Sequence, residues 1–383
     1  WDLGGSLKEL TASLHVSLGC DPELFITRVA GRVRQRIAAV ESGRIVPPDV
    51  LQAGFGWVSR DGVQVELHTQ PTGCRQSVAC NIHYAFTKLQ SMTKEACKKD
   101  PSVAISFEPM MTLTRGDLAR LSSDARELNC KPSLNAYGRE PIHRDGSTYP
   151  IRTASGHLQL GTALPKHVDP VKIVKMLDLL LGIPCVLVDQ HPSQRIRRET
   201  YGRAGEYRLP PHGLEYRVPS NFWLLDYTLQ SMVFGWAKFA MRVAEGHKAR
   251  NTNKPIKDAF LDKVDFKEVE QAINTNDWDM ALRIYKESIR PTADTIYGSV
   301  GFGKELMDPF EYFIHRIHEL GLASWFDVRP TSVLARWKLQ SSMVPGWESF
   351  LLYTVTPQCQ KAKVKRIILD PAAATLVERR VAA

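Results

Sequence analysis

The feature that most restricts the fold is a hairpin pattern in residues 54–68, GFGWVSRDGVQVELH. Asp61-Gly62 separates two alternating runs, and glycine tolerates the positive φ that a tight hairpin turn requires. The second run alternates between two faces, with Val63, Val65 and Leu67 on one and Gln64, Glu66 and His68 on the other. The pattern predicts an antiparallel sheet in which Glu66 projects from a polar, solvated face.

Three further short runs carry polar side chains at strand spacing. Residues 16–27, VSLGCDPELFIT, predict a strand, and the i, i+2 spacing of Asp21 and Glu23 places both on one face. The strand predicted at 157–161, HLQLG, places His157 and Gln159 together in the same way. Short strands are also predicted at 207–208 and 214–217, where Glu215 and Arg217 share a face.

An arginine cluster lies between Arg195 and Arg217, RIRRETYGRAGEYRLPPHGLEYR. The guanidinium group is a rigid fork of donors that matches phosphate oxygens, so the cluster predicts a phosphate partner, although Glu199 also allows structural ion pairs. The carboxylates and the histidine on the predicted strands are ligand types that suit magnesium. Together these groups are the parts of an ATP-using site.

The remaining elements are predicted from periodicity. Helices are expected at 75–98, 115–128, 169–181, 264–274, 276–289 and 308–320, and a buried helix capped by Ser220 is expected to run to about 244. The apolar run from Cys185 to Asp189 predicts a buried strand. Residues 129–153 predict a long loop, and loops of this length are often functional.

Composition limits the class of protein. The chain has 383 residues, 43% hydrophobic and 24% charged, which is ordinary for a globular protein. The net charge of +9 permits an anionic partner such as a nucleotide or nucleic acid without requiring one. Seven cysteines occur without a Cys-x-x-Cys pair, so zinc and a secreted disulfide framework are disfavoured. The helix predicted over 222–243 contains charged residues, which disfavours a membrane span, and we expect a cytoplasmic protein.

The chain is expected to have two parts. The polar segment KARNTNKPIK, residues 248–257, predicts a linker. We therefore expect a catalytic domain over residues 1–246 and a mainly helical C-terminal extension over 247–383. Residues 360–383 alternate basic and apolar groups and predict a strand and a final helix.

The order of the motifs resembles one family. GCDPELF, DGVQVELHTQP, GHLQLG, RRETYGRAGEYR and GLEYRVPSNFW together resemble the phage-type carboxylate–amine ligases of the glutamine synthetase and glutamate–cysteine ligase superfamily. The resemblance covers about residues 16–245. It implies an α+β fold, in which a curved antiparallel sheet carries helices on its outer face and the active site on the other.

The resemblance also implies roles for individual residues. Metal ligands would be Asp21, Glu23, Glu66, His157 and Glu215, with Glu66 near the reacting carboxylate. Phosphate would be held by Arg198, Arg203 and Arg208, with Gln159 also at the cofactor and Arg217 at the transferred phosphoryl group or the substrate. The catalytic residues would be Glu66, Arg203 and Arg217. Residues 129–153 would form a lid. Lys131 stands where related sequences carry an acidic residue, and this difference argues against a substrate-binding role for that loop.

The implied reaction is ATP-dependent amide or peptide-like bond formation through an acyl phosphate, with Mg²⁺, or alternatively Mn²⁺, as the metal. The substrates would be a small-molecule or peptide carboxylate and an amine, in the bacterial cytoplasm during bacteriophage infection. Nucleic acid is a further partner that the sequence permits without requiring it, and the sequence also permits an oligomer. Two other functions also remain open: a virion-associated or partner-binding structural protein, and a guanidino-type phosphotransferase.

Overall fold

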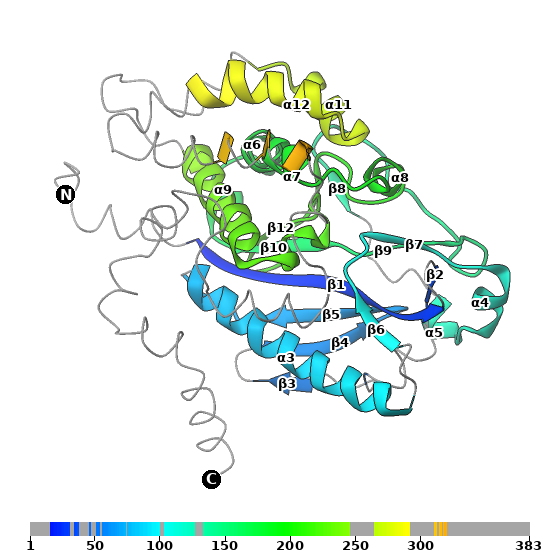
Figure 1. Ribbon diagram of the computed structural model, residues 1–383. Helices are drawn as coiled ribbons and strands as arrows, with labels where there is room; N and C mark the ends of the chain where they lie inside the picture. Colours follow the sequence, from blue (N-terminus) through cyan, green and yellow to red (C-terminus); the bar gives the residue numbers. More distant parts are fainter. Residues whose placement is uncertain are drawn as a thin grey trace, which may run out of the picture.

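The architecture is an open antiparallel sheet with helices packed on one face (Figure 1). The computed structural model describes residues 16–30, 34–37, 46, 51–53, 56–73, 75–99, 103–126, 133–245, 264–291, 310–311, 314–315 and 317–319. Its larger sheet has the order β3-β4-β5-β1-β10-β12-β11-β8, with β2 and β6 also paired to β1, and the described path does not close into a barrel. The α+β fold class expected from the sequence is confirmed.

The strands have the following bounds: β1 Ser17–Ala30, β2 Arg34–Ile37, β3 Leu51–Ala53, β4 Gly56–Asp61, β5 Gln64–Thr69, β6 Val103–Ser106, β8 Leu134–Asn135, β10 Gly156–Gly161, β11 Glu206–Arg208 and β12 Gly213–Tyr216. A smaller sheet pairs β7, Met110–Thr112, with β9, Ile151–Thr153. The predicted hairpin is confirmed, since β4 and β5 pair across a turn in which Gly62 has φ 57°.

Strand β1 lies at the centre of the sheet and changes neighbours along its length. Its first part, Ser17–Pro22, pairs with β10, and Glu23–Phe25 pairs with β5. Side chains of odd number on β1 point to one face, and those of even number, such as Leu18 and Leu24, enter the hydrophobic core on the other. One strand therefore presents Asp21 and Glu23 together, as their spacing predicted.

The helices that cover the core face explain why that face is apolar. Helix α3, Arg75–Lys99, packs on β4 and β5, while α6, Pro170–Leu177, packs on α9, Tyr227–Glu245. The 3-10 helix η3, Asn221–Leu225, begins at Ser220, whose side chain accepts from the amide of Phe222. Ser220 thus caps this short helix, and α9 starts only at Tyr227.

A second helical layer lies outside the first (Figure 1). Helix α11, Phe266–Thr275, and α12, Trp278–Ile284, pack on α7, Ile183–Val188, and α12 continues into the π-helical turn η4, Tyr285–Ile289. Val269, Ala272 and Ile273 are fully buried in the same core cluster as the sheet. The predicted linker and residues 360–383 lie outside the described residues.

Three predicted elements differ in the structure. The run from Cys185 to Asp189, predicted as a strand, belongs to helix α7, which follows α6 and the π turn η2, Asp178–Gly182, without a break. A short apolar run does not distinguish a buried strand from a buried helix, which is why the prediction was wrong. The helix predicted at 115–128 is divided into α4, Arg115–Arg120, and α5, Ser123–Arg126, because Leu121 is extended. The arginine cluster, for which no helix was predicted, begins in helix α8, Gln194–Arg198.

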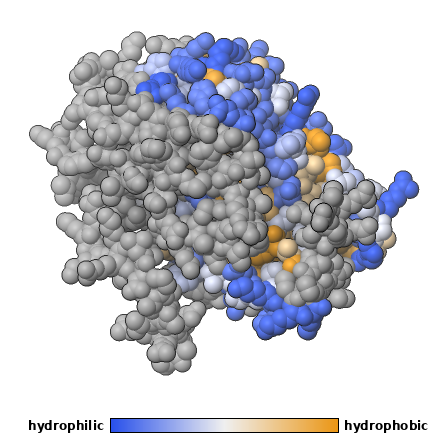
Figure 2. Space-filling view, viewed as in Figure 1, coloured by the Kyte–Doolittle hydropathy of each residue, from blue (hydrophilic) through white to orange (hydrophobic). Residues whose placement is uncertain are grey.

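The described surface in Figure 2 is mainly hydrophilic, with small hydrophobic areas between hydrophilic ones. Among the described residues with exposed large hydrophobic side chains are Leu134, Ile196 and Leu209. None of the described helices combines the length and the apolarity needed to cross a bilayer.

Candidate functional site

The face of the sheet opposite the helices collects the polar side chains of five strands. Antiparallel register brings them into rows, because directly opposed residues project to the same face. The pairs are Asp21 with His157, Glu23 with Glu66, Gln159 with Glu215, and Arg208 with Glu215. Nearly every polar residue predicted from strand spacing therefore lies on this one face.

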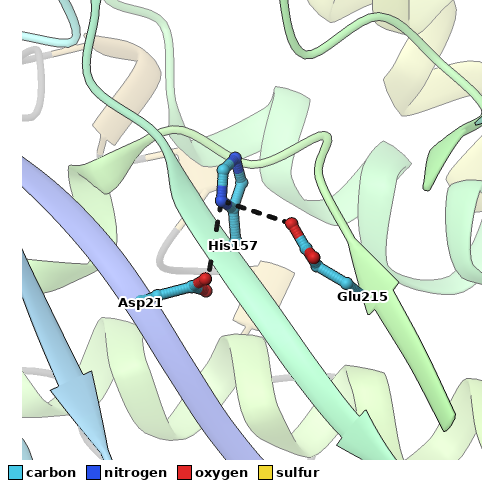
Figure 3. Close-up of side chains that lie close together, drawn as sticks. All are labelled: Asp21, His157 and Glu215. Carbon is cyan, nitrogen blue, oxygen red and sulfur yellow. Dashed lines mark ion pairs between the residues drawn. The ribbon is translucent and has the colours of Figure 1, made fainter. Parts of the chain in front are cut away.

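Asp21, His157 and Glu215 form the tightest group on this face (Figure 3). Their ligand atoms all lie within 4.8 Å of one another, and among the described residues they form a group that can hold a metal ion. His157 Nδ1 is 3.6 Å from Glu215 Oε1 and 4.0 Å from Asp21 Oδ1. Two carboxylates and one imidazole nitrogen are a donor set that divalent cations accept in proteins.

Two atoms at the centre of this group lack the partners that buried polar atoms usually have. Asp21 Oδ1 and His157 Nδ1 are both buried without a hydrogen-bond partner. Burial, with Arg217, Arg208 and Arg197, holds the pKa of His157 well below its usual value, so the imidazole is neutral and can ligate. The residues fit a divalent cation, which would use both unpartnered atoms.

The carboxylates of this face repel one another. Burial raises the pKa of Asp21 to about 8, with Glu66 and Glu215 adding to the effect. Burial, Asp61 and Glu66 also raise the pKa of Glu23 well above its usual value. Such shifts mean that the ionised forms need positive charge nearby, which a bound cation supplies.

Glu23 and Glu66 lie next to the tight group, on the β1–β5 side. Glu23 is buried, and its Oε2 accepts a hydrogen bond from the amide of Ser155 at 2.7 Å. Glu66 Oε2 lies 3.1 Å from Nε2 of His68, and that nitrogen is also 2.6 Å from Ser59 Oγ. The acidic half of the site is thus built from β1, β4 and β5.

The basic half of the site lies on the other side of Glu215. Arg208 Nη2 donates to Glu215 Oε1 at 2.7 Å, and Arg217 Nε lies 3.2 Å from the same oxygen. The Arg217 side chain is fully buried and its Nη1 donates to Ser133 Oγ at 2.7 Å. Two guanidinium groups beside a carboxylate-rich cation site favour an anionic ligand there, such as a phosphate.

Gln159 has both ends of its amide occupied within the protein. Its Nε2 donates to Asp21 Oδ2 at 3.0 Å, and its Oε1 lies 2.8 Å from Nε2 of His212. It therefore links the tight group to an exposed histidine of the β11–β12 connection. The cofactor contact expected for Gln159 remains a prediction.

Two of the predicted phosphate ligands lie elsewhere. Arg203 Nε donates to Glu206 Oε1 at 2.8 Å, and its Nη2 donates to the carbonyl of Glu140 at 3.0 Å. Arg198 is buried, its Nη1 donates to the carbonyl of Gly202, and its charged neighbours include Asp178, which accepts from Tyr216 on the helix-covered side. The structure brings Arg208 and Arg217 to the tight group, but not these two.

The site is more enclosed than the solvated sheet face that we expected. Glu23, His157, Glu215 and Arg217 are all less than 5% exposed. A small hydrophobic cluster covers the sheet beyond Glu23 and consists of Phe25, Val63, Leu113, Leu118, Leu121 and Ala154. The chain between β6 and β8, which carries Leu113, Leu118 and Leu121, therefore folds over the polar face of the sheet. Pattern analysis of single strands does not reveal this.

The segment predicted as a lid is fastened in the described part. Arg152 is buried and donates to the carbonyls of Tyr149, Ile151, Gly146 and Arg126. Asn135 forms part of β8, which pairs with β11, and Arg139 forms an ion pair with Glu270. Lys131 lies outside the described residues.

Sequence reasoning missed two residues of the site. Tyr201 places its hydroxyl 2.9 Å from Nε2 of His157 and accepts from Arg217 Nη2. Asp61, taken only as a turn residue, contributes to the electrostatics of Glu23. Tyr201 stands inside the arginine cluster, but no strand periodicity marks it, so only the folded chain shows its role.

Comparison with known proteins supports the resemblance. Residues 145–285 match the family described as phage phiEco32-like COOH.NH2 ligase-type 2, a stretch that includes His157, Glu215 and the arginine cluster. The match confirms the resemblance to the carboxylate–amine ligases over these residues, and it supports an enzyme of that type. It ends beyond residue 245, where the recognised motifs stopped.

The solved structures that are similar include a distant one. The crystal structure of the complex between prokaryotic ubiquitin-like protein Pup and its ligase PafA aligns with a TM-score of 0.45 and 10% identity, covering 96% of this chain and 72% of that chain. A similarity this distant fixes neither the substrate nor the mechanism. The comparison with curated proteins found no match.

Proposed function

We propose that this enzyme is ATP- and magnesium-dependent and acts through an acyl phosphate, and the match of residues 145–285 to the phage-type carboxylate–amine ligases supports this. The observation that carries the proposal is that Glu215 lies between a group of metal-ligand type and two arginines. On one side stand Asp21 and His157, and on the other stand Arg208 and Arg217. A site of this composition suits a nucleoside triphosphate bound together with a divalent cation.

The cation would be held by Asp21, His157 and Glu215, with Glu23 and Glu66 as carboxylates for a neighbouring cation or for orienting the substrate. Bound Mg²⁺ supplies neutralisation of phosphate charge and alignment of the reacting groups. Arg208 and Arg217 would contact phosphate oxygens, and Arg217 would also contact the transferred phosphoryl group or the substrate. The roles predicted for Arg198 and Arg203 would require contacts other than those in the structure.

The chemistry follows from the weakness of a carboxylate as an acyl donor. An oxygen of the substrate carboxylate attacks the terminal phosphorus of ATP, and ADP leaves. The amine then attacks the acyl carbon, inorganic phosphate leaves, and the amine gives up a proton. Arginine donors fixed in a buried site stabilise the charge that develops during transfer. Enclosure of the site protects the acyl phosphate from water.

The substrates are proposed as a small-molecule or peptide carboxylate and an amine, within the cytoplasm of a bacterial host. The acidic half of the site, with Glu23 and Glu66, suits a cationic amine as well as a metal. The basic half suits the carboxylate and the phosphates. The two substrates would then approach from the two sides of Asp21 and Glu215.

The test is product analysis with hydroxylamine as a general amine and a panel of carboxylates. We expect ADP, phosphate and hydroxamate in equal amounts, with the wild type and with Glu199→Gln, an exposed control in the same segment as the arginines. Glu23→Gln is expected to be inactive yet folded, because the new amide oxygen can still accept from Ser155. A phosphorylated product without hydroxamate would instead identify a phosphotransferase.

A further inference from the structure

The two ring nitrogens of His157 face different surroundings. Nδ1 faces Asp21 and Glu215 and has no hydrogen-bond partner. Nε2 lies 2.9 Å from the hydroxyl of Tyr201. His157 is buried, and its ring lies tilted against the Tyr201 ring, with 5.7 Å between their centroids. Tyr201 therefore contacts both the polar edge and the face of this histidine.

Tyr201 is itself held on two sides. Its backbone amide donates to the carbonyl of Arg197 at 2.8 Å, and Arg197 is a buried residue that donates to the carbonyls of Val218 and Pro219. Its hydroxyl accepts from Arg217 Nη2, and the Arg217 guanidinium carbon lies 4.9 Å from the ring centroid. The position of the hydroxyl is thus determined by segments other than β10, which carries His157.

A histidine that binds a metal through one nitrogen commonly uses the other in a hydrogen bond that fixes the orientation of the ring. Without that bond, rotation of the ring exchanges the places of a nitrogen and a carbon. We propose that Tyr201 is a positioning residue, which holds His157 so that Nδ1 points to a divalent cation shared with Asp21 and Glu215. This inference rests on the metal site of the proposed function, and extends it to a residue outside the ligand set.

The geometry distinguishes this role from two simpler ones. A tyrosine that only packed against the sheet would not need its hydroxyl between His157 and Arg217. A tyrosine that contacted phosphate directly would act independently of His157. The first reading predicts that removal of the hydroxyl leaves metal binding unchanged. The second predicts that its removal weakens phosphate binding to an extent that does not depend on His157.

The experiment is a titration with Mn²⁺ alone, in which free Mn²⁺ is measured by electron paramagnetic resonance. The variants are Tyr201→Phe, His157→Gln and the two combined. Tyr207→Phe is the matched control, because Tyr207 lies on β11 with its side chain in the core cluster. We expect Tyr201→Phe to weaken Mn²⁺ binding by about tenfold or more, and Tyr207→Phe to leave it unchanged.

The combined variant decides whether Tyr201 acts through His157. If it does, Tyr201→Phe adds no further loss in the His157→Gln background, since coupled residues are not additive. An equal loss in both backgrounds, or no loss in either, would overturn the inference. Failure of the wild type to bind Mn²⁺ would overturn the metal site of the proposed function as well.

A second measurement covers the case in which His157→Gln binds too weakly to titrate. In metal-free protein, the ¹⁵N shifts of the His157 ring are assigned by their loss in His157→Gln. We expect one fixed tautomer in the wild type and in Tyr207→Phe, and averaged shifts in Tyr201→Phe. The same fixed tautomer in Tyr201→Phe would contradict the positioning role.

Discussion

At the scale of single residues, Asp21 gives the clearest support for the proposal that the site binds a cation. Its carboxyl is placed among Glu66 and Glu215, and burial raises its pKa to about 8. In a folded protein without a cation, ionising this group is costly, because the charged form loses water and meets other negative charges. Ionisation of Asp21 therefore costs free energy in the metal-free protein, and a bound cation would offset that cost.

The first prediction concerns the stability of the metal-free protein as pH changes. Because the folded-state pKa of Asp21 is raised from 3.8 to about 8, folding binds protons in this range. The contribution is fully present below about pH 4 and is lost as pH rises through about 8. The free energy of unfolding, measured by urea denaturation, should therefore fall over this range.

Asp21→Asn should lessen that fall, because the amide does not ionise. Mg²⁺ should also lessen it, because the cation binds the ionised carboxylate and releases its proton. A stability that is equally pH-dependent in the wild type, in the variant and with Mg²⁺ would show that Asp21 is not responsible.

The arginines give a second prediction at the same scale. Arg208 contacts Glu215, whereas Arg203 contacts Glu206 and the carbonyl of Glu140. We expect Arg208→Ala to weaken binding of a non-hydrolysable ATP analogue by roughly tenfold or more, since bonds to charged groups contribute about 1.5–3 kcal/mol. Arg203→Ala should have the smaller effect in the same calorimetric titration. The reverse order would place the phosphates nearer Arg203.

Residue types and spacing were enough to predict much of the candidate site. The i, i+2 spacing placed Asp21 with Glu23, and His157 with Gln159, on one face, which the register of β1 and β10 shows. Spacing did not distinguish Arg208 from Arg198, because Arg198 lies in helix α8 and Arg208 on strand β11, so no single strand period relates them. Tyr201 was missed for the same reason.

Secondary-structure elements were predicted best where periodicity is strong. The hairpin of β4 and β5 and the long helix α3 follow the sequence pattern closely. Helix α7 was taken for a strand, because Ile183–Val188 is apolar on all sides and is buried on all sides. Periodicity carries no information when every face of an element is covered.

The segment over residues 133–152 supplies a prediction at the scale of elements. Arg152 is only 1% exposed and binds four carbonyl groups, which fastens this segment beside β9. Arg152→Met should make the amides of 139–152 exchange with deuterium more rapidly, as expected for a local loss of about 2 kcal/mol. Arg144→Met, an exposed change in the same segment, is the control. Equal exchange in both variants would mean that other contacts hold the segment.

At the scale of the molecule, the described residues form a sheet with two helical layers on one face and the polar site on the other. The outer layer, α11 and α12, packs on α7, and Ile273 is fully buried there. The boundary at residues 246 and 247 was placed by the polar composition of the linker, which says nothing of how later helices pack. The boundary stays a prediction, and the packing of α11 allows a direct test of whether both parts share stability.

Ile273→Ala should lower the free energy of unfolding of the whole chain by about 2–5 kcal/mol, because the cavity would lie between α11 and the core. Ile196→Ala, at an exposed position, should change it little. Urea denaturation followed at the tryptophans of the core gives the comparison. A separate transition for the C-terminal part, with the sheet unaffected, would instead support two independent units.

The most direct measurement is magnesium-dependent binding of a non-hydrolysable ATP analogue, by calorimetry, to the wild type, Glu215→Gln and Glu199→Gln. We expect the wild type and Glu199→Gln to bind the analogue more tightly with Mg²⁺ than without it. Glu215→Gln should lose this dependence, because Glu215 is the residue shared by the cation and the arginines. Equal magnesium dependence in Glu215→Gln, or no binding to folded wild type, would contradict the proposed site.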